Sequence, residues 1–146
     1  MTPRFLIDTS CMVAVLCAWH EHHERATRAI EQRLDEGQTL VVAAPGLIEA
    51  YAVLTRLPPP HRLSPSNSGA LLTANFMNDG VEVAALGIDR YARLLGGAAR
   101  RGIAGGAIYD AVIVACALAA GIDALLTFNQ RQFHLLAARE VDIVVP

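Results

Sequence analysis

Phe5-Leu6-Ile7-Asp8-Thr9-Ser10 decides the fold of this chain, because an unbroken apolar run ends at an acid and two hydroxyl residues follow. A short apolar run of this kind is typical of a strand that is buried on both faces. Thr9 and Ser10 are good N-caps, and they predict a helix that continues through about Trp19. The chain therefore begins with a strand, an acid and a helix in direct succession.

The same alternation of apolar strands and helices continues along the rest of the chain. Further strands are predicted at residues 40–43, 81–84, 124–127 and 142–145, and further helices at residues 20–36, 46–56, 64–78, 88–101, 109–120 and 130–136. This alternation predicts an α/β fold with a doubly wound parallel sheet of about five strands flanked by helices. Because the length suits one hydrophobic core and no repeat interrupts it, we expect residues 1–146 to form a single domain.

The charged residues exclude several functions. All 12 basic residues are arginine, and the net charge is −2. A general nucleic-acid coat protein would carry an excess of basic residues, but an acidic nuclease site that binds a divalent cation remains compatible with this charge. Phosphotransfer enzymes of the haloacid-dehalogenase type and receiver domains use a lysine to hold the phosphoryl group. The absence of lysine argues against both.

The apolar content points to a partner and to a cytoplasmic location. Hydrophobic residues make up 53% of the chain and the mean hydropathy is +0.36, which is more than one small core absorbs. We therefore expect a second copy or another chain to cover part of the surface. No uncharged apolar stretch approaches the roughly 18 residues of a membrane span, so we expect a cytoplasmic protein.

Three acids stand at positions where a carboxylate has either a structural or a chemical role. Asp8 ends the first strand, Glu49 lies among apolar residues of a helix, and Asp110 begins an otherwise uncharged apolar helix. Taken singly, they suit a turn, a solvent-facing position and the positive end of a helix dipole. Ligand sites of doubly wound sheets lie beyond the carboxyl ends of the central strands, where Asp8, Asp110 and Asn129 would meet. Together the acids predict a site for hydrated Mg²⁺ or Mn²⁺.

These pieces resemble a known family, the PIN-domain nucleases, and within it the VapC toxins of bacterial toxin–antitoxin pairs. The matching pieces run in order over essentially the whole chain. They are Phe5-Leu6-Ile7-Asp8-Thr9-Ser10, Glu49, Gly105-Gly106-Ala107-Ile108-Tyr109-Asp110-Ala111, Leu125-Leu126-Thr127-Phe128-Asn129 and Phe133. Each motif is short, and the ordered set is the specific signal.

The resemblance implies a homodimeric endoribonuclease that depends on Mg²⁺ or Mn²⁺ and cleaves cellular RNA. It also implies inhibition by a cognate VapB antitoxin, whose C-terminal segment would lie in a groove near the active site. By position, Asp8, Glu49 and Asp110 would form the acidic metal site. The hydroxyls of Thr9, Ser10 and Thr127 would position substrate or water.

The chain departs from the family pattern at one position. Many relatives have an aspartate two residues after the threonine of the fourth strand, and this chain has Asn129. An amide oxygen can orient a metal-bound water but carries no charge, which puts a second metal ion in doubt. The alternative function is therefore a regulatory protein that binds RNA and antitoxin with little or no cleavage.

Two further groups keep two interpretations each. His20, His22 and His23 suit either a solvated helix start or a position beside the substrate. The arginines of one predicted helix and its end suit either RNA phosphates or a solvated face, and these are Arg90, Arg93, Arg100 and Arg101.

Overall fold

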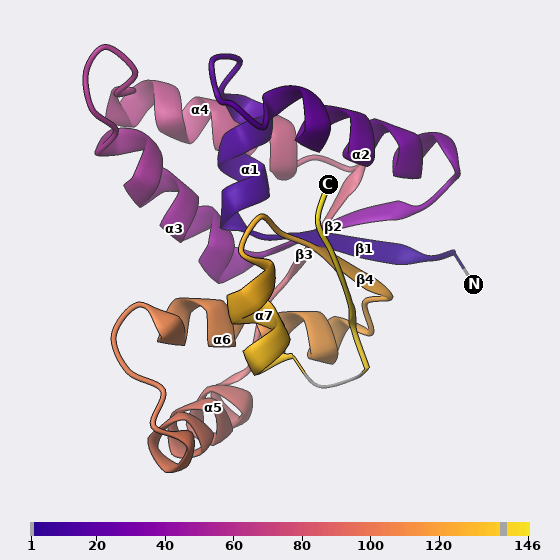
Figure 1. Ribbon diagram of the computed structural model, residues 1–146, viewed down its shortest axis with the longest axis vertical. Coiled ribbons are helices and arrows are strands. Elements are labelled where there is room, and N and C mark those ends of the chain that lie inside the picture. Colours follow the sequence, from indigo (N-terminus) through magenta and orange to yellow (C-terminus); the bar gives the residue numbers. More distant parts are fainter. Residues whose placement is uncertain (1, 138–139) are drawn as a thin grey trace.

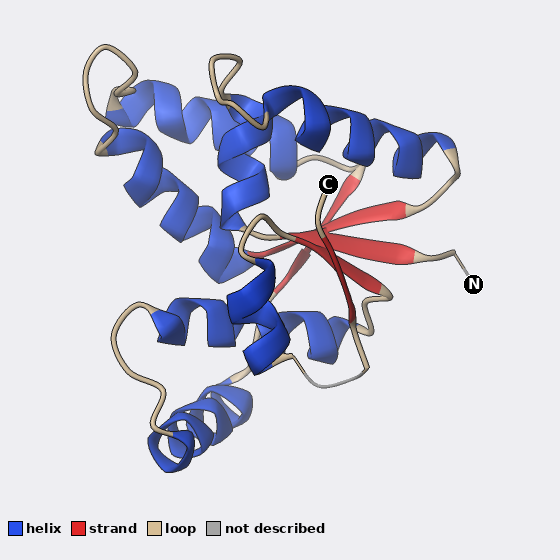
Figure 2. Cartoon of the chain, in the orientation of Figure 1, coloured by secondary structure: helices blue, strands red, loops and turns tan. Residues whose placement is uncertain are grey.

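Five parallel strands form the centre of the computed structural model, which describes residues 2–137 and 140–146 (Figure 2). The strands are β1 (Arg4–Ile7), β2 (Thr39–Ala43), β3 (Val81–Ala84), β4 (Ala124–Leu126) and β5 (Asp142–Val144). The helices are α1 (Thr9–Leu16), α2 (His23–Asp35), α3 (Ala44–Thr55), α4 (Pro65–Phe76), α5 (Ile88–Arg101), α6 (Ala107–Ala120) and α7 (Gln130–Leu136). The predicted α/β class with a parallel sheet is confirmed.

Alternate residues of each strand supply two separate cores. Phe5 and Ile7 point into a core shared with α1 to α4, whereas Leu6 belongs to the core on the other face, with Ile113 of α6 and Phe133 of α7. Helices α1 to α4 lie on one face of the sheet, and α6 and α7 cover the opposite face, with α5 packed on the outer side of α6 (Figure 1). Because successive strand residues point to opposite faces, an unbroken apolar strand needs helices on both sides.

The strand order β3-β2-β1-β4-β5 places a topological switch point between β1 and β4. The chain runs outward from β1 through β2 to β3, and then returns to pair β4 with the free side of β1. The helices that follow β1 and β4 leave for opposite faces of the sheet, as Figure 1 shows for α1 and α7. Such a switch point opens a crevice at the carboxyl ends of the two strands.

The first helix begins and ends earlier than its sequence predicts. Asp8 is its N-cap, in place of Thr9 or Ser10, because the Asp8 carboxylate accepts the N–H of Cys11 at 2.9 Å. The helix ends at Leu16, and Cys17 adopts an extended backbone, so the predicted continuation through Trp19 is wrong. Residues 17–22 form a loop whose aromatic rings stack on other segments, and these long-range contacts outweigh the local helix preference.

Three other helices differ at their starts by two residues or more. α2 begins at His23, where residue 20 was predicted. α3 begins at Ala44 and α6 at Ala107, each two residues before the predicted start. Within the described residues, none of the helices combines the length and apolar character needed to cross a bilayer.

Candidate active site

Asp8 sits at the carboxyl end of β1 with only 3% of its surface exposed. One carboxylate oxygen accepts hydrogen bonds from the Ser10 hydroxyl at 2.6 Å and the Cys11 N–H at 2.9 Å, and the other accepts from the Thr127 hydroxyl at 2.6 Å. Burial raises the pKa of Asp8 above its ordinary value, and the hydrogen bonds oppose this effect only in part. The carboxylate is therefore held in one orientation by neutral donors.

The same hydroxyls tie the segment after β4 to the end of β1. The Ser10 hydroxyl accepts the N–H of Phe128 at 3.1 Å, and the Thr127 hydroxyl accepts the N–H of Asn129 at 2.8 Å. Each hydroxyl donates to Asp8 and accepts from a backbone N–H, so it fixes the position of the Asp8 carboxylate relative to the segment after β4. Ser10 and Thr127 thus connect two strand ends that are distant in sequence.

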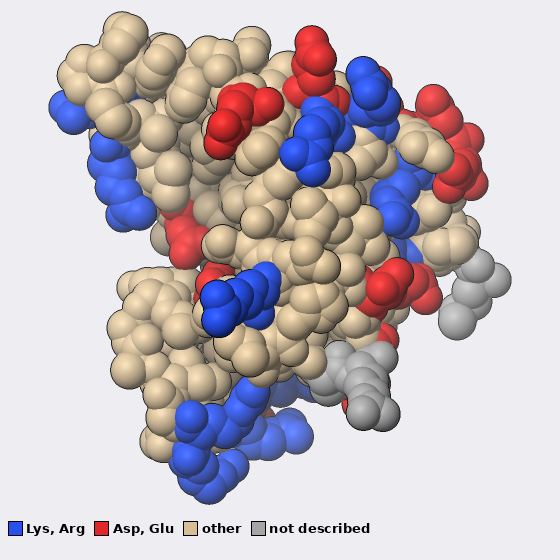
Figure 3. Space-filling model, viewed as in Figure 1, with Lys and Arg blue, Asp and Glu red and all other residues tan. Residues whose placement is uncertain are grey.

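Glu49 and Asp110 line the same cleft as Asp8. The cleft has a volume of about 450 Å³, and its lining also includes Thr9, Ser10 and Asn129. In the space-filling view, acidic side chains lie in the hollow between α3 and α6 (Figure 3). Burial, then the negative charges of Glu49 and Asp8, raise the pKa of Asp110 to about 6. Glu49 and Asp8 therefore lie close enough to Asp110 for their charges to act on it.

Among the described residues, no basic side chain forms an ion pair with these three acids. In the part of the chain that the structure describes, the ion pairs are Arg4 with Glu82 and His22 with Glu21, and neither involves Asp8, Glu49 or Asp110. The cleft lining within these residues includes no arginine. A buried carboxylate is ordinarily paired with a cation or coordinates a metal. The donor set therefore fits a divalent cation, which would relieve the mutual repulsion.

The carboxylates do not stand as a closed ligand cluster. Across residues 2–137 and 140–146, no three His, Cys, Asp or Glu side chains are grouped tightly enough to hold an ion as they stand. Mg²⁺ needs only one or two carboxylates, because waters complete its coordination.

Thr9 adds an unused polar group to the cleft. Its residue is 7% exposed, and its hydroxyl oxygen is buried without a hydrogen-bond partner among the described residues. A buried hydroxyl without a partner is unfavourable unless water or a ligand satisfies it. The hydrogen-bonding capacity of the Thr9 hydroxyl is therefore unused among the described residues.

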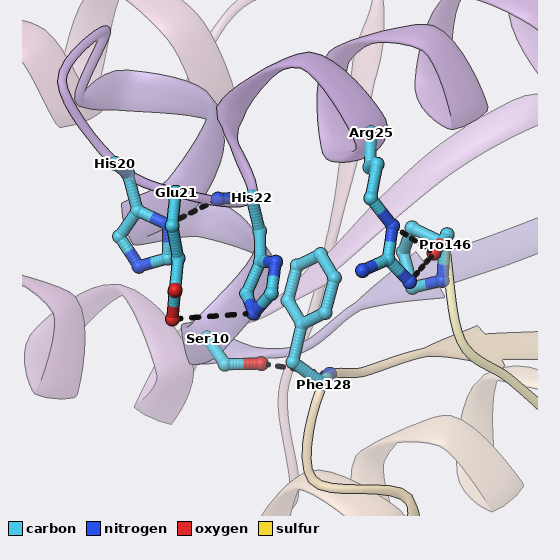
Figure 4. A network of polar contacts seen from close by, with 7 residues as sticks. All are labelled: Ser10, His20, Glu21, His22, Arg25, Phe128 and Pro146. Carbon is cyan, nitrogen blue, oxygen red and sulfur yellow. Dashed lines mark hydrogen bonds and ion pairs between the residues drawn. The ribbon is translucent and has the colours of Figure 1, made fainter.

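The rim of the cleft contains residues that sequence analysis left undecided. His20 and His22 line the cleft and are partly buried, so they do not form a solvated helix start. The His22 ring stacks on Phe128 at 4.4 Å between centroids, and the Arg25 guanidinium lies over Phe128 at 5.6 Å (Figure 4). Sequence reasoning did not find this stack, because it joins segments more than 100 residues apart.

An apolar groove adjoins the acidic cleft. It has a volume of about 850 Å³ and shares Glu49 and Gly106 with the cleft. Its walls include the exposed side chains of Ile48, Met77 and Tyr109. A groove this apolar is typical of a protein-binding surface.

The fold and the acidic cleft define a class of small α/β protein that suits metal-dependent phosphodiester chemistry. The family model for the PIN domain matches residues 5–138. Ribonuclease VapC40 of Mycobacterium tuberculosis is 40% identical over 140 residues, which cover 93% of this chain and 94% of that protein. The chain therefore belongs to the PIN domain family and groups there with the VapC proteins.

Solved structures of the same fold agree with this assignment. The crystal structure of VapC20 of M. tuberculosis, described as a sarcin-ricin loop cleaving toxin, is 18% identical with a TM-score of 0.69, and the match covers 92% of this chain and 96% of that one. The structure of VapBC2 from Rickettsia felis bound to promoter DNA is 16% identical with a TM-score of 0.67, and the match covers 98% of both chains. At these identities the likeness shows the fold.

Proposed function

We propose that this protein is an endoribonuclease toxin that uses Mg²⁺ or Mn²⁺ at Asp8, Glu49 and Asp110 and is neutralised by a VapB-type antitoxin. The observation that carries the proposal is the cleft itself, where three carboxylates meet without a basic partner among the described residues. The relative VapC40 is named a ribonuclease, which supports RNA as the substrate. An RNA substrate would be met in the cytoplasm.

The chain's own residues divide the work of such a site. Asp8, fixed by Ser10 and Thr127, would be the rigid ligand, and Glu49 and Asp110 would complete the set from α3 and α6. A divalent ion supplies a more acidic bound water and neutralises charge that develops at the phosphate. The ligands at this site would all be oxygen atoms, which favours Mg²⁺ or Mn²⁺.

Two neutral residues would position the water and the substrate. Thr9 has a hydroxyl without a hydrogen-bond partner among the described residues, and Asn129 has a side-chain amide at the edge of the cleft. Because Asn129 is uncharged, we propose a single ion at this site.

RNA cleavage by the purified protein tests this function. Wild-type protein should cut RNA with Mn²⁺ or Mg²⁺, EDTA should stop the reaction, and Asp8→Asn should lose nearly all activity. Asp79→Asn, an exposed acid in the turn before β3, is the matched control and should stay fully active. Equal breakdown by wild type and Asp8→Asn would point to a contaminating nuclease. Intact RNA in all samples would favour the non-cleaving regulator.

The proposed partner occupies the apolar groove. VapBC2 and related structures contain a VapB with its VapC, and the groove lies directly beside the acidic cleft. A bound antitoxin segment would bury Ile48 and Met77 and close access to Glu49. The product of a small neighbouring gene should therefore co-purify with the wild type, and Ile48→Glu should abolish this co-purification while RNA cleavage persists. Unchanged co-purification would place the partner elsewhere.

A further inference from the structure

A continuous series of rings runs along one rim of the cleft. We call it the ring array, and it comprises His61, Trp19, His20, His22 and Phe128, ending at the Arg25 guanidinium. The centroids are separated in order by 4.0, 5.8, 5.6 and 4.4 Å, and Arg25 lies 5.6 Å from the Phe128 centroid. These spacings are those of aromatic pairs in contact.

The two ends of the ring array differ in their surroundings. At one end Phe128 is enclosed between His22 and Arg25, and Arg25 also donates to the Pro146 carbonyl (Figure 4). At the other end Trp19 is 47% exposed and stacks on His61. The enclosed end holds the loop in place, whereas the exposed end offers ring faces to solvent.

The ring array also lies next to the chemistry. His20, His22 and Phe128 line the same cleft as Asp8, Glu49 and Asp110. Burial and the neighbouring imidazole of His22 lower the pKa of His20, which favours the uncharged form of its ring. Because the rings and the carboxylates line one cleft, a strand of RNA with a phosphate at the carboxylates would have its adjoining bases beside these rings.

The charge of the described cleft lining favours contacts to bases over side-chain contacts to phosphates. The described lining contains Asp8, Glu21, Glu49 and Asp110 and no arginine. Among the described lining residues, basic side chains that could neutralise phosphates, the usual source of RNA affinity, are thus absent. Stacking of bases on rings is the remaining strong interaction, and it does not depend on charge.

We propose that the ring array binds unpaired bases of a single-stranded RNA segment beside the scissile phosphate, with Trp19 and His61 as the outer stacking pair. The inference rests on the proposed ribonuclease function and names the residues that would hold the bases next to the site of cleavage. Bases of a duplex are stacked on one another and cannot lie on these rings, so a single-stranded loop or end is required.

Trp19 is the only tryptophan of the chain, and its fluorescence reports contact with the ring array directly. A short single-stranded oligoribonucleotide should quench this fluorescence in EDTA at low salt, where no cleavage occurs. The same sequence as a duplex, and an abasic oligomer of equal length, carry the phosphates without available bases. Both should bind about tenfold more weakly. Equal affinity for the abasic oligomer would overturn the proposal.

Paired substitutions separate ring stacking from loop structure. Trp19→Leu and His61→Leu should each weaken binding of labelled single-stranded RNA about fivefold to tenfold, whereas Trp19→Phe and His61→Phe should stay within about twofold of wild type. Circular dichroism should be unchanged in all four. Equal losses in the leucine and phenylalanine variants would show that the rings do not stack on bases.

The outcome is independent of whether the protein cleaves RNA. Because binding is measured without metal, quenching by single-stranded RNA supports the ring array even if the cleavage test fails. RNA that is cut but does not quench Trp19 would overturn the ring array and leave the ribonuclease proposal standing. Quenching by an antitoxin peptide and by no RNA would assign the array to protein binding and would likewise overturn it.

Discussion

Asp8 keeps a carboxylate in a position that is almost closed to solvent, and three neutral donors surround it. Charge-assisted hydrogen bonds of this kind are short and strong, and they fix the direction of both oxygens. Their net effect still leaves the pKa of Asp8 raised, because burial outweighs them. The arrangement of the site therefore lowers the stability of the metal-free protein.

Replacing Thr127 by valine tests one of the two shortest of these contacts. Thr127→Val keeps the shape but removes the donor to Asp8 and the acceptor for the Asn129 N–H, so we expect the free energy of unfolding to fall by about 2–3 kcal/mol. Thr127→Ser keeps the hydroxyl and should lose only about 1 kcal/mol for the buried methyl group. Urea unfolding at neutral pH measures both. Equal losses in the two variants would mean that the hydroxyl is unimportant.

Asp110 provides a prediction with a defined pH dependence. Its pKa of about 6 in the folded protein lies above the ordinary value of 3.8, so its contribution to stability is fully present below pH 3.8 and is lost as the pH rises through 6. Without metal, Asp110→Asn should therefore unfold at a higher temperature than wild type at pH 7.5. Allowing for solvent screening, we expect the free energy of unfolding to rise by about 1–2 kcal/mol. Each kcal/mol should raise the melting temperature by roughly 2–4 °C.

The same comparison near pH 4 is the control. There Asp110 is protonated in the folded protein, and the two melting temperatures should agree. A gain of the same size at both pH values would show that charge repulsion is not its cause.

At the scale of elements, the position of Glu49 depends on how closely α3 approaches α1. A Cβ built at Gly46 would lie 2.9 Å from the Cε of Met12 and 3.7 Å from the Thr9 hydroxyl oxygen. Gly46 lies in the first turn of α3 and precedes Glu49 by less than one helical turn. A glycine here lets the helix backbone carry Glu49 into the cleft.

Gly46→Ala should show the effect of this close approach when it is combined with Met12→Leu. In the Met12→Leu background, which removes the Cε, alanine should stabilise the helix by roughly 0.5–1 kcal/mol. In the wild-type background the contact should cancel or reverse this gain and lower RNA cleavage. Urea unfolding of the four proteins gives the coupling energy. The same change in both backgrounds would contradict the proposed steric contact.

The sequence predicted the elements better than it predicted their ends. The strand at residues 81–84 and the helix at residues 88–101 coincide with β3 and α5, because apolar spacing and glycine residues mark them locally. The length of α1 was predicted wrongly, because Trp19 leaves the helix to stack on His61, a contact that no local pattern encodes. Likewise, the placement of Asp8, Glu49 and Asp110 in one cleft required the strand order, which only the structure supplies.

At the scale of the whole molecule, an apolar surface extends beyond the antitoxin groove. Ile88 and Leu95 of α5 are 81% and 65% exposed, and they lie on the same side of the helix as Tyr91, which lines the groove. An exposed apolar stripe of this kind is unfavourable in a monomer and suits an interface between two copies.

We therefore expect the isolated protein to be a homodimer. Sedimentation at micromolar concentration should give twice the chain mass, and the double variant Ile88→Glu/Leu95→Glu should sediment as a monomer with an unchanged circular dichroism spectrum. Arg90→Glu, on the same helix, is a control for charge alone and should remain dimeric. A monomeric wild type would contradict the expectation.

Binding of Mn²⁺ to the purified protein, measured by calorimetry, tests the central claim most directly, because it asks whether the three carboxylates share one ion. The account predicts one bound Mn²⁺ per chain, with binding lost or weakened at least about tenfold in Asp8→Asn, Glu49→Gln and Asp110→Asn and unchanged in Asp79→Asn. Wild-type protein that binds no Mn²⁺, or three variants that bind it as tightly as wild type, would contradict the account.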